Sequence, residues 1–178
     1  MTFHFRIQHL CGVWLLCLLS SGALAGWQEV LPEARVVGSG ELRLFGFRIY
    51  NARLWSPQQP FTVEAPFALE LTYHRAISRD DLVAASLKEI RRLNGRAVDE
   101  AQLERWRADM QRALVDVKPG ERITGVHLPG QGARFYAGQH LQHEIADSAF
   151  ARAFFDIWLD PRTRNPELRA RLLGQARP

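Results

Sequence analysis

Residues Val36 to Trp55 read VVGSGELRLFGFRIYNARLW, and the fold can be worked out from this stretch. β-branched and aromatic residues dominate it, and its glycines leave no helical spacing, which predicts two strands broken at Gly46. One face would carry Phe45, Phe47 and Ile49, and the other Leu44, Tyr50, Ala52 and Leu54. Since both faces are largely apolar, we expect this segment in the middle of a sheet, covered on both sides by protein or ligand.

Three arginines interrupt this apolar stretch: Arg43, Arg48 and Arg53. A buried guanidinium without a partner is very unfavourable, so each must either reach solvent along its aliphatic stem or hold an anion.

The first 25 residues have the pattern of an export signal. A basic start at Arg6 precedes an apolar run over 10–19, and Ala23-Leu24-Ala25 fits a cleavage site. The apolar run is shorter than the roughly 20 residues of a membrane span, and no later segment approaches that length. We therefore expect cleavage after Ala25, a periplasmic or secreted location, and one domain over residues 26–178.

The cysteines and charges narrow the chemistry of the mature chain. Both cysteines, Cys11 and Cys17, lie within the signal, so no disulfide or thiol chemistry is expected. Cleavage would remove one arginine and no acid, which lowers the net charge from +4 to +3. Acidic and basic residues are interleaved along the chain, so no nucleic-acid partner is expected. The oligomeric state stays open.

A further strand is predicted from Phe67 to Arg75. Alternation places Phe67, Leu69, Leu71, Tyr73 and Arg75 on one face. An arginine thus ends an otherwise apolar row. Either Arg75 marks the strand end and reaches into water, or it holds an anion or carbonyl at the mouth of an apolar cavity, with Tyr73 beside it.

The remaining segments complete an α+β pattern. We expect a helix from a Ser78 cap to Asn94, a helix from an Asp99 cap through Leu114, strands over 122–128 and 133–136, an aromatic-rich helix after Asp147, and a short helix from Pro166. Five strands and four helices in this order predict an antiparallel sheet with helices packed on one face.

Several kinds of site are not expected. His140 and His143 lie near each other, but their spacing matches no recognised metal-ligand motif, and loop histidines beside a hairpin are usually solvated. The sequence contains no Gly-x-Ser-x-Gly nucleophile elbow, and Gly38-Ser39-Gly40 does not open a helix as a phosphate-binding loop would. We predict no metal and no cofactor.

Three ordered blocks resemble the chalcone isomerase-like family. The first is Gly38-Ser39-Gly40 with residues 46–55, the second is residues 69–78, and the third is residues 154–161, FFDIWLDP. The likeness spans about residues 36–174 and is closest to the exported bacterial branch. It implies an open-faced β-sandwich, in which a large antiparallel sheet carries helices on one face and a cleft at its edge.

The resemblance implies two kinds of activity. Plant members close a chalcone into a flavanone, which needs an arginine for the phenolate and hydroxyl donors for the developing enolate. Arg43 corresponds to that arginine, although its spacing from Gly40 differs from the plant pattern, and Tyr50 would supply a hydroxyl. The plant threonine and asparagine positions have no clear match in this chain.

A second branch binds fatty acids without catalysis, through an arginine near the end of the middle strand and a tyrosine. Arg75 matches that arginine, and either Tyr50 or Tyr73 would supply the hydroxyl. A guanidinium can grip a carboxylate with two parallel hydrogen bonds.

The sequence therefore favours an exported binding protein for a small apolar anion, a fatty acid or a phenolic compound, with Arg75, Tyr73, Tyr50 and Arg43 as ligand-binding candidates. One alternative is an intramolecular lyase acting on an enone through Arg43 and Tyr50. Another is a scaffold or interaction protein whose cleft is filled by side chains.

Overall fold

The computed structural model of the chain describes residues 26–175. The predicted export signal, with Cys11 and Cys17, lies outside the described residues. Within the described part of the chain, none of the helices combines the length and the apolar character that crossing a bilayer requires.

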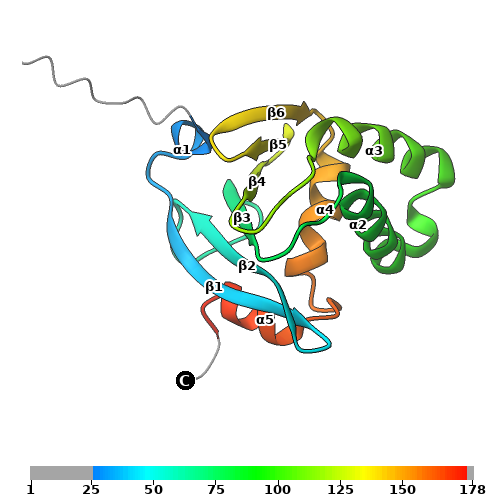
Figure 1. Cartoon of the computed structure of the whole chain (residues 1–178). Helices are drawn as coiled ribbons and strands as arrows, with labels where there is room; N and C mark the ends of the chain where they lie inside the picture. Colours follow the sequence, from blue (N-terminus) through cyan, green and yellow to red (C-terminus); the bar gives the residue numbers. More distant parts are fainter. Residues whose placement is uncertain (1–25, 176–178) are drawn as a thin grey trace, which may run out of the picture.

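A single antiparallel sheet forms the centre of the molecule. Its six strands are β1 (Arg35–Leu44), β2 (Phe47–Ser56), β3 (Phe67–Tyr73), β4 (Arg122–Leu128), β5 (Gly132–Ala137) and β6 (His140–Ile145). They lie side by side in chain order, so every strand pairs with its sequence neighbours (Figure 1). The predicted antiparallel sheet is confirmed, but it has six strands, because β6 was missed and its histidines, His140 and His143, are strand rather than loop residues.

The β1–β2 hairpin confirms the predicted break at Gly46. Phe45 and Gly46 connect the strands with φ angles of 51° and 82°, the pattern of a two-residue type I′ turn. The expectation that this segment lies mid-sheet is wrong, because β1 is an edge strand. The apolar residues that suggested two covered faces lie partly at the turn, where Phe45 is 100% exposed and Phe47 is 63% exposed.

The helices begin and end largely where their caps predict. They are α2 (Arg79–Asn94), α3 (Glu100–Ala113), α4 (Ser148–Leu159) and α5 (Pro166–Leu172), with a short 3-10 turn over Gly95–Ala97. Ser78 Oγ accepts a hydrogen bond from the Asp81 amide at 3.1 Å, and Asp99 accepts one from the Gln102 amide at 2.7 Å. The predicted helices after Ser78 and Asp99 are therefore confirmed.

Two apolar layers lie on opposite faces of the sheet. Helices α2 to α5 cover one face, and the main core forms between them and inward residues such as Leu69 and Phe135 (Figure 1). A single-turn helix, α1 (Trp27–Val30), packs on the other face, where Trp27 meets Ala68 and Val126. The predicted one-sided helical cover is thus confirmed for the longer helices.

Two glycines in β1 allow α5 to approach the sheet closely. A Cβ built on Gly38 would lie 2.0 Å from the carbonyl oxygen of Arg171, and one on Gly40 would lie 2.7 Å from Leu168 Cδ1. Either contact is too short for a real side chain. The Gly38-Ser39-Gly40 motif therefore serves helix packing.

Candidate functional site

A large cavity lies between the sheet, where residues of β1 to β5 line it, and helices α2 and α4. Its volume is about 540 Å³, which falls within the range of roughly 300–1,000 Å³ that small-molecule sites occupy. Its wall is mainly apolar and includes Leu42, Leu69, Leu71, Ile123, Phe135 and Phe154. The cleft is therefore open, in contrast to the filled cleft of the scaffold alternative.

Gly125 lies in the cavity wall on β4, between Leu69 of β3 and Phe135 of β5. A Cβ at this position would come within 3.1 Å of the Phe155 ring and 3.4 Å of the Phe135 ring. A side chain here would therefore press on the aromatic packing as well as reduce the cavity.

Arg75 lies at the edge of this cavity. The strand was predicted to run to Arg75, but β3 ends at Tyr73, so Arg75 belongs to the link between β3 and α2; it still lines the cavity. The guanidinium carbon is 5.6 Å from the centre of the Phe47 ring, a distance typical of a cation–π contact. Among residues 26–175, no carboxylate pairs with it.

The acidic residues that line the cavity already have partners. Asp81 accepts a hydrogen bond from the Ser78 hydroxyl at 2.6 Å. Glu89 pairs with Arg92 at 2.8 Å and with Arg164 at 2.6 Å. Arg75 is therefore available to an anion that enters the cavity.

Two tyrosines lie against each other in the cavity wall. The ring centres of Tyr50 and Tyr73 are 5.9 Å apart, with the rings nearly perpendicular. Tyr50 Oη accepts a hydrogen bond of 2.9 Å from Trp158 Nε1, whereas the Tyr73 hydroxyl makes no hydrogen bond to another described side chain. Burial raises the pKa of Tyr50 to about 12 and also raises the pKa of Tyr73. Both phenols are therefore neutral near pH 7 and can donate a hydrogen bond.

The structure brings three of the four predicted site residues together and leaves the fourth outside. Arg75, Tyr73 and Tyr50 line the same cavity. Arg43 is absent from its lining, and its side chain is 61% exposed with Nε 2.6 Å from Glu41 Oε1. Arg48 pairs with the same carboxylate, which the two arginines hold below its usual pKa.

The other predicted features fall away from the cavity. His140 and His143 lie on the exposed β6 edge, and no cluster of potential metal ligands occurs within residues 26–175. His127 lines a second cavity of about 380 Å³ together with Arg152 and Asp156. Its pKa is lowered by burial and by the charge of Arg152.

Sequence reasoning missed Trp158 as part of the site. Its indole lines the cavity and holds the Tyr50 hydroxyl, although 108 residues separate the two positions in the chain. The only available signal was the third block of the resemblance, residues 154–161, which marks the right helix without indicating which side chain turns inward.

Comparison with known proteins agrees with this architecture. A solved structure of a fatty-acid binding protein from Arabidopsis thaliana superimposes with a TM-score of 0.63, covering 79% of this chain and 87% of that one at 11% identity. At that identity the likeness concerns the fold. No curated protein sequence shows significant similarity. The family model described as chalcone isomerase-like matches residues 36–174, so the chain belongs to the chalcone isomerase-like family.

Proposed function

We propose that this chain is an exported binding protein that holds a small apolar anion, a fatty acid or a phenolic compound, in the large cavity without transforming it. The observation that carries the proposal is a guanidinium, that of Arg75, which has no acidic partner within residues 26–175 and lies at the edge of an apolar cavity. An apolar tail would occupy the cavity, and its acidic group would bind Arg75.

The two tyrosines support the same ligand chemistry. The Tyr73 hydroxyl has no side-chain partner among the described residues, so it is free to donate to a bound carboxylate or phenolate. Tyr50 accepts from Trp158, which leaves its own proton for the ligand. We therefore assign the main hydroxyl contact to Tyr73 and a supporting one to Tyr50.

Two further considerations favour binding over chemistry. A solved structure with the same fold is that of a fatty-acid binding protein. The arginine that the resemblance connects with cyclisation, Arg43, pairs with Glu41 away from the cavity. We therefore do not extend the proposal to the lyase alternative. The export signal over residues 1–25 would place the carrier in the periplasm or outside the cell.

The test is binding of a fluorescent fatty acid, together with mass analysis of ligands that co-purify with the native protein. Arg75→Ala should weaken binding about ten- to a hundredfold, because charge-assisted hydrogen bonds contribute about 1.5–3 kcal/mol. The affinity of Arg75→Lys should lie between those of the parent and Arg75→Ala, since lysine keeps the charge but cannot form the two parallel hydrogen bonds.

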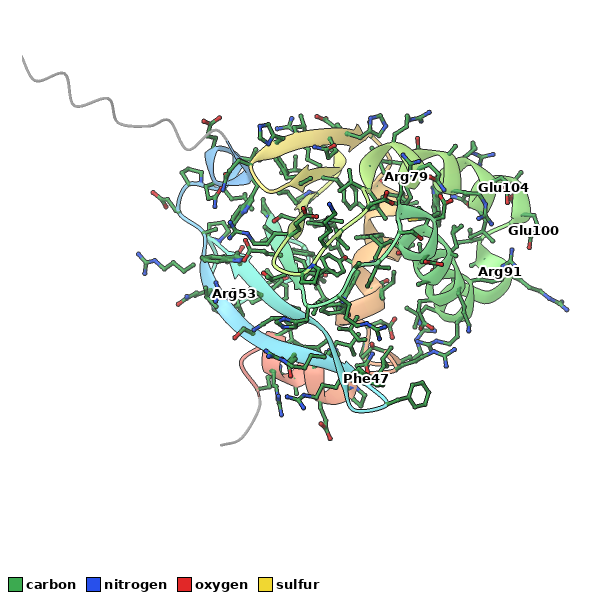
Figure 2. All side chains as sticks on the ribbon, viewed as in Figure 1. Phe47, Arg53, Arg79, Arg91, Glu100 and Glu104 are labelled. Carbon is green, nitrogen blue, oxygen red and sulfur yellow. The ribbon has the colours of Figure 1, made fainter. Side chains whose placement is uncertain are left out.

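Arg53→Ala provides the matched control. Arg53 is also an exposed arginine, but it does not line the cavity and lies on β2 away from Phe47 (Figure 2). This variant should bind as the parent does. Equal affinity of the parent and Arg75→Ala would contradict the proposed role of Arg75, and absence of any bound apolar anion would contradict the function itself.

A further inference from the structure

The tip of the β1–β2 hairpin, defined as residues 43–48, exposes apolar side chains that the fold does not use. Phe45 is 100% exposed, Phe47 is 63% exposed and Leu44 is 47% exposed. Figure 2 shows Phe47 at the outer end of the hairpin. Single exposed apolar residues are ordinary, but three within four positions of one turn form a local patch.

The backbone of the turn makes the choice of Phe45 unusual. Among residues 26–175, it is the only non-glycine residue with a positive φ, 51°. Type I′ turns favour Asn-Gly at these two positions, because asparagine tolerates the left-handed region far better than an aromatic residue. The chain thus accepts local strain and places an aromatic ring in water, so the turn itself does not explain Phe45.

The patch is surrounded by positive charge. The side chains of Arg43 and Arg48 are 61% and 55% exposed, and both pair with a single carboxylate, Glu41. Arg75 adds a third guanidinium beside the Phe47 ring. Three cations against one acid leave a net positive ring around an apolar tip, which is the charge pattern that an anionic bilayer surface attracts.

The tip is also continuous with the large cavity. Leu44 lies in the turn region and lines the cavity, and Ile49 lines it just beyond the turn. Arg75 belongs to both, since it lines the cavity and contacts Phe47. A surface held against the tip would therefore lie next to the cavity edge.

We propose that the hairpin tip docks onto anionic phospholipid bilayers. Phe45 and Phe47 enter the interfacial layer, where aromatic rings are favoured, and Arg43, Arg48 and Arg75 face the lipid phosphates. Docking itself does not depend on the proposed function. Its use does rest on that function: an apolar anion would pass between bilayer and cavity without crossing water.

Vesicle sedimentation tests this directly. Residues 26–178 contain every described helix and strand, and using this portion keeps the apolar run at 10–19 out of the measurement. The protein should sediment with vesicles of phosphatidylcholine and phosphatidylglycerol in equal parts, bind less to phosphatidylcholine alone, and bind less as salt is raised. Phe45→Asn should reduce vesicle binding about tenfold or more while keeping or raising the melting temperature.

Leu141→Asn is the matched control, because Leu141 is 51% exposed on β6 at the opposite edge of the sheet. It should leave vesicle binding unchanged. Unaltered binding by Phe45→Asn, or equal losses in both variants, would overturn the proposal. So would a parent that ignores vesicles but forms a dimer that Phe45→Asn dissolves, since a second copy would then cover the tip.

The two proposals fail separately. Phe45→Asn should still bind the fluorescent fatty acid in solution, because Phe45 does not line the cavity. Vesicle binding without any ligand binding would leave the docking proposal standing and refute the carrier. Ligand binding without vesicle binding would refute the docking proposal and leave the proposed ligand-binding function standing.

Discussion

Helix α4 packs against the two halves of the sheet in different ways. Towards β5 and α3 its rings interlock: Phe150 stacks on Phe154 at 5.6 Å and meets Trp106 of α3 at 5.7 Å, and Phe154 meets Phe135 of β5 at 5.0 Å, where Phe135 and Phe154 also bound the cavity. Towards β1 and β2 the same helix borders a hollow of about 540 Å³. The difference indicates that the solid half supplies stability, while the hollow half is free to serve binding.

The largest loss of stability should come from truncating a side chain in the tightly packed region between α4, β5 and α3, the solid half. Phe150 is fully buried, so Phe150→Ala should lower the free energy of unfolding by about 3–5 kcal/mol. Leu71 faces the existing hollow, so Leu71→Ala should cost about 2 kcal/mol, the low end for such a truncation. Chemical denaturation measures both, and Phe150→Leu serves if the alanine variant does not fold. Equal losses at the two sites would remove the distinction between the halves.

The two tyrosines should separate stability from binding. Tyr50→Phe deprives Trp158 Nε1 of its acceptor, so the free energy of unfolding should fall by about 1–3 kcal/mol. Tyr73→Phe removes a hydroxyl that has no side-chain partner among residues 26–175, so the free energy of unfolding should change by less than about 0.5 kcal/mol, while affinity for the apolar anion falls. Thermal unfolding and ligand titration measure the two quantities. If Tyr73→Phe lowered the free energy of unfolding and Tyr50→Phe did not, the assignment of Tyr50 to stability and Tyr73 to binding would be wrong.

The smallest effect concerns alkaline pH. Burial raises the pKa of Tyr50 to about 12 and also raises those of Tyr73 and Tyr136, the other two tyrosines of the chain. Unfolded tyrosines lose their protons near pH 10, before the folded ones do. The stabilisation is therefore complete below about pH 10 and is lost as pH rises through about 12.

Phenolate absorbance provides the measurement. The folded protein should show little phenolate at pH 10, and the free energy of unfolding should decline above that pH. The decline should be shallower in Tyr50→Phe, which has one raised pKa fewer. A full phenolate signal at pH 10 in the folded protein would contradict the burial of these hydroxyls.

Local signals in the sequence predicted most of the helices and the β1–β2 break. Ser78 and Asp99 satisfy nearby amides, so each helix start is decided within four residues. The β6 strand escaped detection because four of its six residues, including Leu141, are exposed at the sheet edge. With Ile145 as its one buried residue, β6 shows too little alternation to detect.

The candidate site was predictable only where local alternation along a strand indicated it. Alternation along the predicted strand from Phe67 to Arg75 placed Tyr73 and Arg75 on one apolar row, and both residues line the cavity. Apolar composition misled at the β1–β2 turn, because Phe45 is apolar without being buried. The role of Trp158 could not be inferred, since a hydrogen bond across 108 residues depends on tertiary packing.

The position of Trp158 has an optical consequence. Among residues 26–175, it is the only tryptophan that lines the large cavity, while Trp27 and Trp55 pack together on the opposite face of the sheet and Trp106 lies in the solid half. Intrinsic fluorescence therefore contains one indole whose surroundings change between water and hydrocarbon as the cavity fills. The emission of Trp158 should therefore report whether the cavity is occupied, without an added label.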